Sequence, residues 1–96
     1  SLAKSGIESA CRQLSIELAE AGIAVNAIQA GVTDTPALRK IPGNEIMIKN
    51  AINNNPHKRL TTVKDIANVI EMLASYESSW MTGNIIKVDG GEDITS

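Results

Sequence analysis

The feature that most constrains the fold of this chain is an apolar run that ends in small residues. Residues 23–29 read Ile-Ala-Val-Asn-Ala-Ile-Gln, and Ala30-Gly31 follows directly. A run rich in β-branched side chains is typical of a strand. Small residues at the carboxyl end of a parallel strand let backbone amides approach a ligand. The sequence therefore predicts a strand at 23–29 that ends at a ligand-binding crevice, where Thr33 and Thr35 add hydroxyl groups.

A helical pattern precedes this strand. Apolar residues recur every three or four positions over 7–18, with charged residues between them, and Gly22 follows as a helix stop. Local signals place the start of the helix at Ser5, because Ser5-x-x-Glu8 has the form of a capping box. The only cysteine, Cys11, belongs to the apolar positions of this helix and is expected to be a small buried side chain.

A second helix and a second strand follow. Thr62-x-x-Asp65 precedes an amphipathic pattern and predicts a helix over 63–75 with a box-like cap. Ile85-Ile-Lys-Val88 is typical of a short buried strand between turn-forming residues. Helix, strand, helices, strand is the order of a βαβ protein, and the chain shows no internal repeat and no linker. The sequence therefore predicts the α/β class and a single unit over residues 1–96.

The segment from Pro36 to Lys58 mixes turn-forming residues with large apolar ones. Asp34-Thr35-Pro36 is expected to form a turn, and a short helix is expected near 44–53. A polar loop would not carry so many large apolar side chains, so the segment is interpreted as a mobile cover that closes over something apolar. The alternative is a helical connection packed on the core. The side chains assigned to this substrate lid are Leu38, Ile41, Ile46 and Met47.

Composition narrows the classes of function. The net charge is −2, Lys and Arg are scattered, and Tyr76 and Trp80 are the only aromatic residues, so nucleic acid is not an expected partner. No run of about 18 apolar residues could span a membrane, and a cytoplasmic domain is the default. His57 has no partner at metal-ligand or triad spacing and is assigned to a surface loop, so no metal is predicted. Asp89 is expected to support the turn after the second strand.

Five short motifs follow one another at a consistent spacing. They are Ala3-Lys4-Ser5-Gly6, Glu17-Leu18, Gly22-Ile23-x-Val25-Asn26-Ala27-Ile28, Ala30-Gly31-x-x-x-Thr35 and Gly83-x-x-x-x-Val88-Asp89-Gly90-Gly91. Together they resemble the C-terminal portion of short-chain dehydrogenases/reductases. The resemblance implies the C-terminal part of a Rossmann-like, doubly wound parallel sheet and an NAD(P)-dependent oxidoreductase. It also places the start of the first helix upstream of Ser5. The family's catalytic tyrosine, four residues before the lysine, would fall one residue before Ser1, and its glycine-rich turn would lie further upstream.

The resemblance implies a role for several residues. Lys4 would bind the nicotinamide ribose and lower the pKa of the tyrosine, whereas the alternative is a solvated lysine at a helix end. The backbone at Thr33 would pair with the nicotinamide carboxamide, in a cofactor-binding loop that includes Val32 and in which Gly31 lets the chain turn. The hydroxyl of Thr35 would reach the carboxamide or the pyrophosphate. The alternative for Thr35 is a turn hydroxyl that caps its own backbone.

Two positions depart from the family pattern. Ala30 stands where most relatives have proline, and Thr33 stands where they usually have valine or isoleucine. The Ala-Gly pair is familiar in the enoyl-acyl-carrier-protein reductases of the family. With the apolar lid, the resemblance implies a fatty-acyl or polyketide-like thioester, small or carried by an acyl carrier, reduced with NAD or NADP by a homo-oligomer. The rival reading is a non-catalytic truncated chain that serves in subunit association.

Overall fold

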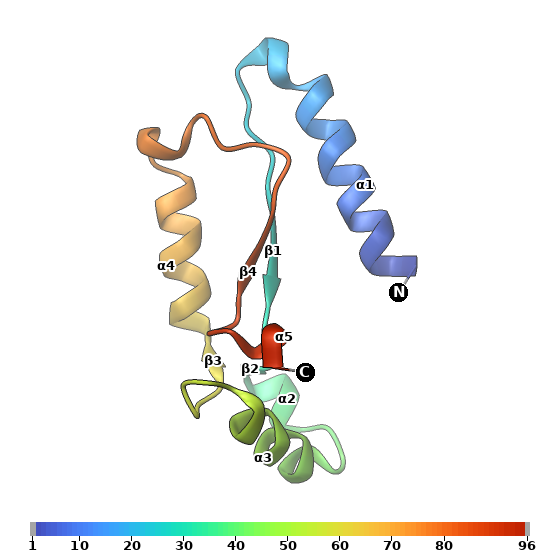
Figure 1. Ribbon diagram of the computed structural model, residues 1–96, viewed down its shortest axis with the longest axis vertical. Coiled ribbons are helices and arrows are strands. Elements are labelled where there is room, and N and C mark those ends of the chain that lie inside the picture. The colour runs from blue at the N-terminus through green and yellow to red at the C-terminus, as the bar shows by residue number, and fades with distance from the viewer. Residues whose placement is uncertain (1, 96) are drawn as a thin grey trace. The chain divides into compact units, whose positions relative to one another are not determined.

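The computed structural model describes residues 2–95 and the side chains from Lys4 to Ile94. Strand β1 pairs with β4, and β2 pairs with β3 in parallel (Figure 1). The α/β class predicted from the sequence is confirmed. The elements in chain order are α1 (Leu2–Glu17), the 3-10 turn η1 (Ala19–Ala21), β1 (Ala27–Ala30), β2 (Thr33–Asp34), α2 (Pro36–Arg39), α3 (Asn44–Asn54), β3 (Thr61–Thr62), α4 (Val63–Leu73), the 3-10 turn η2 (Tyr76–Ser78), β4 (Ile85–Val88) and α5 (Glu92–Thr95).

The chain divides into two compact units. The first contains the residues up to Gln29 together with Ile70–Ile86, and the second contains Ala30–Val69 together with the residues from Lys87 onward. The prediction that residues 1–96 form one unit of a larger dehydrogenase domain concerns the whole protein, and it stays a prediction. Within residues 2–95, none of the helices has both the length and the apolar character that a membrane crossing requires.

Helix α1 begins earlier than the local signals predict. It already includes Leu2, so Ser5 and Glu8 lie inside the helix and do not form its capping box. The start upstream of Ser5 that the family resemblance implies is therefore confirmed. The helix ends at Glu17, and after η1 the chain reverses at Gly22, which has a φ of 73°. Glycine adopts this left-handed conformation without a steric penalty, and the predicted helix stop is confirmed.

Strand β1 is shorter than the predicted strand over 23–29. The residues before Ala27 are tied to the loop 81–84 by irregular hydrogen bonds, which replace a regular ladder. The amide of Val25 donates to Thr82 Oγ1 (3.0 Å), and its carbonyl accepts from the amide of Gly83 (2.7 Å). The side chain of Asn26 bonds Met81 O (2.9 Å) and both amide groups of Asn84 (3.1 and 3.2 Å). The pattern of β-branched residues does not show that, in this part of the predicted strand, side-chain and irregular hydrogen bonds replace the regular ladder of a sheet.

The apolar face of α1 is only partly covered within the first unit. Cys11 is 5% exposed, and its Sγ lies 3.5 Å from Val25 O and 3.6 Å from Asn84 O, as expected for a small buried side chain. Ile7 and Leu14, on the same predicted face, are 59% and 44% exposed. The helical period was therefore right, while burial is confined to the part of the face around Cys11.

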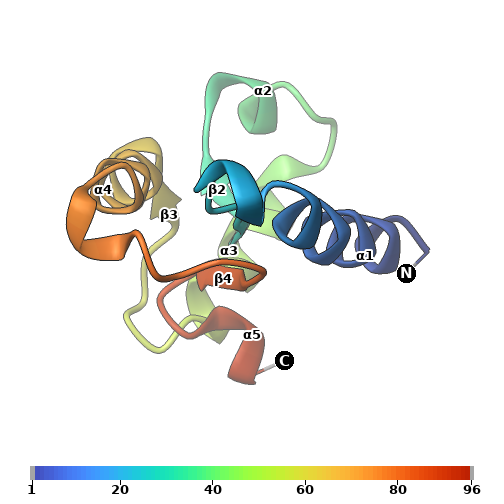
Figure 2. The same ribbon diagram turned by 90° about the horizontal axis from the view of Figure 1, so that it is seen from above.

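The second unit has its own small hydrophobic core. Leu38 from α2, Ile48 and Ala51 from α3, and Leu60 are buried against one another, with Val32 and Ile52 packed on them. Helices α2 and α3 contact each other across the short loop 40–43 (Figures 1 and 2). The sequence predicted α3 but took Asp34-Thr35-Pro36 for a turn, whereas Thr35 caps the short helix α2. Some of the apolar residues between Pro36 and Lys58 are thus explained by their packing in this core.

Helix α4 begins with the reciprocal hydrogen bonds that Thr62-x-x-Asp65 predicts. The amide of Asp65 donates to Thr62 Oγ1 (3.2 Å), and the amide of Thr62 donates to Asp65 Oδ2 (2.8 Å). Arg59 adds two further bonds to the Asp65 carboxylate, at 2.7 and 3.1 Å. The guanidinium of Arg59, followed by the amide and hydroxyl of Thr62, holds the pKa of the Asp65 carboxyl well below its ordinary value.

The cap at Asp65 should make the free energy of unfolding fall at low pH. Its folded-state pKa is depressed, so its stabilising effect is present above the unfolded pKa of about 3.9 and is lost as the pH falls toward the folded-state value. Urea unfolding between about pH 6 and about pH 2 should therefore show a smaller loss of free energy for Asp65→Asn than for the wild type. Glu71→Gln, later in the same helix, should follow the wild type. Parallel curves for Asp65→Asn and the wild type would contradict this role.

Candidate cofactor-binding site

The backbone of the loop Gly31–Thr35, directly after β1, is held by hydrogen bonds with three segments of the second unit. The amide of Gly31 donates to Val88 O at 3.2 Å. The carbonyl of Val32 accepts from the amide of Thr61 (3.2 Å), and the amide of Val32 donates to Glu92 Oε2 (3.1 Å). Both peptide groups that flank Val32 are therefore fixed by other parts of the chain.

The position of Val32 determines where the backbone of Thr33 points. The peptide between Val32 and Thr33 is trans, so its N–H points opposite to the carbonyl that Thr61 binds. Thr33 stands opposite Thr61 in the parallel register, an arrangement that directs the backbone groups of Thr33 away from β3. The side chain of Thr33 turns back and donates to Gly31 O at 2.8 Å. The backbone of Thr33 is thus presented on the side of β2 that faces away from β3.

Glycine is required at position 31 by crowding. Gly31 does not belong to the glycines with positive φ, so the turn expected there does not need its special backbone freedom. A Cβ at this position would lie 2.8 Å from Thr61 Oγ1, 2.9 Å from Asp89 Cβ and 3.1 Å from Glu92 Oε2. Real Cβ atoms essentially never show distances as short as the first two, and the third would be a tight contact. The missing side chain lets the loop, β3 and the turn after β4 meet at one point.

Thr35 has the capping role that the sequence left open as an alternative. Its hydroxyl accepts a hydrogen bond from the amide of Leu38 at 3.2 Å, and Pro36 occupies the first turn of α2. Proline suits this position because a first-turn amide has no partner within the helix. A hydroxyl group can donate a hydrogen bond while it accepts one, so the contact of Thr35 with a cofactor stays a prediction.

The turn after β4 is organised by Asp89, which is 7% exposed. Its carboxylate accepts from the amides of Gly91 (2.9 Å) and Asp93 (3.1 Å), which confirms the predicted support of this turn. Asn55, which is 2% exposed, donates from Nδ2 to Asp89 O (3.0 Å) and accepts from the amide of His57 (2.8 Å). His57 itself is exposed, as expected for a surface loop. These bonds fix the turn that carries Glu92.

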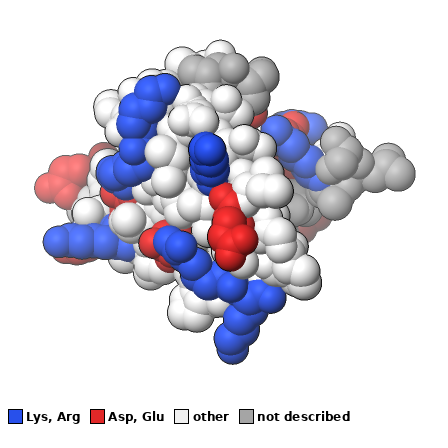
Figure 3. Space-filling model, turned by 90° about the horizontal axis from the view of Figure 1, so that it is seen from below, with Lys and Arg blue, Asp and Glu red and all other residues white. Residues whose placement is uncertain are grey.

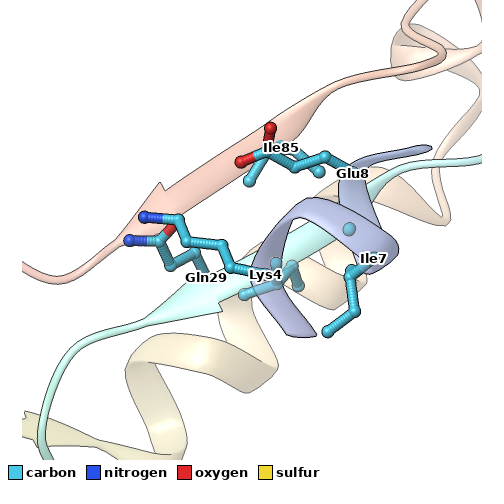
Figure 4. Close-up of a pocket in the computed structure, with 7 residues that line it drawn as sticks. Lys4, Ile7, Glu8, Gln29 and Ile85 are labelled. Carbon is cyan, nitrogen blue, oxygen red and sulfur yellow. The ribbon is translucent and has the colours of Figure 1, made fainter. Parts of the chain in front are cut away.

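Lys4 lies in the first unit, at a pocket between α1, β1 and β4. The pocket has a volume of about 240 Å³ and is mostly apolar. Figure 4 shows the ammonium of Lys4 and the amide of Gln29 extending in the same direction at this pocket. Ala3, from the same predicted motif, lies outside the residues whose side chains are described. The pocket lining consists of Lys4, Ile7, Glu8, Ala27, Ile28, Gln29 and Ile85.

The predicted lid residues fall into two groups. Leu38 is 9% exposed and belongs to the core of the second unit, whereas Ile41 and Met47 are 44% and 40% exposed. Ile46 is 70% exposed. Leu38 can therefore anchor the segment, while the other three side chains are presented to solvent. Their role as a lid stays a prediction.

Charged side chains of the second unit form exposed ion pairs. The guanidinium of Arg39 lies 3.0 Å from Asp34 and lowers the pKa of that carboxyl, and Asp93 lies 2.6 Å from Lys87 and raises the pKa of that ammonium. Pairs of this kind contribute little to stability. Figure 3 shows Lys and Arg interspersed with Asp and Glu on one face. Across residues 2–95, no three His, Cys, Asp or Glu side chains gather in a way that could hold a metal ion.

Three residues of this site were not singled out from the sequence as contributors to it. Thr61, Asn55 and Glu92 contact the strand-end loop or the turn after β4, yet they lie 24 to 61 positions from Gly31 along the chain, by the difference of residue numbers. The Asn55-Pro56 pair was a visible turn signal. Nothing in the local pattern around Glu92 indicated that its carboxylate would reach Val32.

The crowding at Gly31 gives a direct test with a matched control. Gly31→Ala should lower the free energy of unfolding by about 1–3 kcal/mol, the usual cost of overpacking. Gly6→Ala should raise it by about 0.5–1 kcal/mol, since the new methyl meets nothing within 4 Å and alanine favours the helix. Urea unfolding of both variants measures this difference. Equal stability of Gly31→Ala and the wild type would show that the loop relaxes freely.

The comparisons with known proteins agree with the motifs. The family described as enoyl-(acyl carrier protein) reductase matches residues 1–93. An uncharacterized oxidoreductase of Mycobacterium tuberculosis is 39% identical over 95 residues, which are 99% of this chain and 38% of the relative. The 3-oxoacyl-[acyl-carrier-protein] reductase FabG of Buchnera aphidicola is 34% identical over 99% of this chain and 38% of its own length.

A solved structure gives the same answer at the level of the fold. The enoyl-[acyl-carrier-protein] reductase (NADH) of Aquifex aeolicus is 31% identical and has a TM-score of 0.85, over 97% of this chain and 36% of that one. The chain thus spans between a third and two fifths of the length of these relatives. It has the Rossmann-like fold of these enzymes, and it belongs to the short-chain dehydrogenase/reductase family of oxidoreductases.

Proposed function

We propose that the protein carrying this sequence is an NAD(P)-dependent reductase of the short-chain dehydrogenase/reductase type. When bound, the cofactor supplies hydride from its nicotinamide ring to a carbonyl or a conjugated double bond. The observation that carries the proposal is the orientation of the peptide between Val32 and Thr33. This peptide follows the end of β1, and the ends of such strands are where α/β proteins bind dinucleotides. Its N–H is directed away from the paired strand β3.

The backbone of Thr33 fits the group that it would bind. A carboxamide carries an acceptor oxygen and an NH2 group that donates, and a residue at a strand edge offers the complementary pair from its own N–H and C=O. The threonine side chain is engaged with Gly31 O, so it does not compete for this edge. In the proposed complex, Thr33 would fix the rotation of the nicotinamide ring and so determine which face transfers hydride. Gly31 and Val32 would hold Thr33 in place, and the Thr35 hydroxyl would donate to the carboxamide or the pyrophosphate.

Lys4 is proposed as the catalytic lysine. Its ammonium would donate to the ribose hydroxyls and, by its charge, lower the pKa of the tyrosine phenol that acts as proton donor in the family. The support is its place in Ala3-Lys4-Ser5-Gly6 and at a mostly apolar pocket next to β1 and β4.

The proposed substrate is an acyl thioester, free or bound to an acyl carrier. Two named relatives, a 3-oxoacyl and an enoyl reductase, act on groups carried in this way. Ile41 and Met47, which are exposed, would give an acyl chain an apolar surface to lie against. We further propose, by analogy with the family, that the protein works as a cytoplasmic homo-oligomer.

The role of Lys4 is tested by mutation in the protein that carries this sequence. Lys4→Ala should lower kcat/KM by about 100-fold or more, since it removes a group that assists proton transfer, and should leave the melting temperature nearly unchanged. Lys64→Ala, an exposed lysine on α4, is the control and should keep wild-type kinetics. Normal turnover by Lys4→Ala would rule out the catalytic assignment.

The lid is tested by hydrogen exchange with and without NADPH plus an acyl-thioester substrate. Ligand should bring new protection at residues 38–52, because closure would bury exposed apolar side chains and restrain the backbone that carries them. The middle of α4 serves as an internal reference and should exchange equally in both states. If residues 38–52 also exchange equally, the segment is a packed connection and the lid assignment fails.

A further inference from the structure

Glu92 connects the turn after β4 to the strand-end loop. Its Oε2 accepts the amide of Val32 at 3.1 Å, across 60 positions of sequence. The same oxygen lies 3.1 Å from the place where a Cβ at Gly31 would stand. One carboxylate therefore reaches the two residues that precede Thr33.

The backbone of Glu92 is itself restrained. Its amide donates to Asp89 O at 3.1 Å, and the amides of its neighbours Gly91 and Asp93 donate to the Asp89 carboxylate. Asn55 binds the same turn from a third segment. The backbone of Glu92 is thus held in place by the turn, independently of the bond between its side chain and Val32.

The hydrogen bond from Val32 has a consequence one residue further along. Thr61 fixes the peptide after Val32, and Glu92 fixes the peptide before it. With both peptide planes held, the direction of the Thr33 N–H has little freedom to vary. A charged acceptor makes this bond stronger than a neutral one would.

We propose that Glu92 is a positioning residue for nicotinamide recognition, because its carboxylate holds Val32 and thereby aims the backbone of Thr33. The inference rests on the proposed function, since it concerns the same loop. It assigns to Glu92 a role through Val32 and Thr33 and no direct contact with the reacting atoms. The interaction that depends on Glu92 is the one with the carboxamide, while the adenosine part of the cofactor should be bound independently of it.

The test compares two ligands that differ in the nicotinamide ring. The dissociation constants of NAD(P)H and of ADP-ribose, with 2′-phospho-ADP-ribose for an NADPH-preferring protein, are measured by calorimetry on the complete protein. Glu92→Ala should weaken NAD(P)H by about tenfold, as expected for the loss of one well-aimed hydrogen bond, and change the ring-less ligand by less than about twofold. Glu92→Gln keeps an acceptor oxygen and should stay within about threefold of the wild type for both ligands.

Asp93→Asn is the matched control. It alters the neighbouring carboxylate on α5, which pairs with Lys87, and keeps the bond between Glu92 and Val32. Both dissociation constants should match those of the wild type.

Each other outcome overturns the inference. Equal weakening of both ligands by Glu92→Ala would make Glu92 a general support of the fold, and unchanged binding would make its bond to Val32 dispensable. Selective weakening in Glu92→Gln as large as in Glu92→Ala would show that an acceptor oxygen at position 92 is not what holds Val32, and the positioning role would fail. If the wild type binds neither form of NAD(P)H, the proposed function fails as well, whereas normal wild-type binding with any of the other results leaves that function standing.

Discussion

The packing at the end of β1 depends on the absence of a side chain at Gly31. Three segments converge there: β3 through Thr61, the turn after β4 through Asp89, and α5 through Glu92. Thr61 and Asp89 lie closer than a Cβ would allow, and Glu92 lies at a distance that a Cβ would make tight. The hydrogen bonds that fix Val32 can form only because these segments are so close. A single position without a side chain thus determines the geometry of the whole strand-end loop.

Much of the fold could be predicted because its signals are local. The 3.6-residue period over α1 and α4, the cap of Thr62 with Asp65, the left-handed Gly22 and the short strand Ile85–Val88 all follow from residues within a few positions of one another. The capping box at Ser5 was misleading for a physical reason. Ser and Glu three apart are compatible with a helix interior as well as with its start, and only wider context decides between them.

The candidate site was predicted in part. The loop Gly31–Thr35 was located by its place after an apolar run and by its likeness to a family motif. The residues that hold the loop in shape come from other parts of the chain. Their contacts depend on tertiary packing, which leaves no periodic pattern or fixed spacing in the sequence. The reason for glycine was likewise hidden, since the sequence suggested a turn where the structure shows three crowded neighbours. Thr35 shows why one residue can support two interpretations, because a hydroxyl that caps α2 can also donate outward.

The burial of Cys11 has a consequence for studies of motion in the first unit. It is the only thiol in the sequence, and α1 holds it against the carbonyls of Val25 and Asn84. Alkylating reagents attack an exposed thiolate, so modification requires α1 to separate from these carbonyls first. The rate at which Cys11 itself is labelled, followed by mass spectrometry of the peptide that contains it, therefore measures how often α1 separates from these two carbonyls.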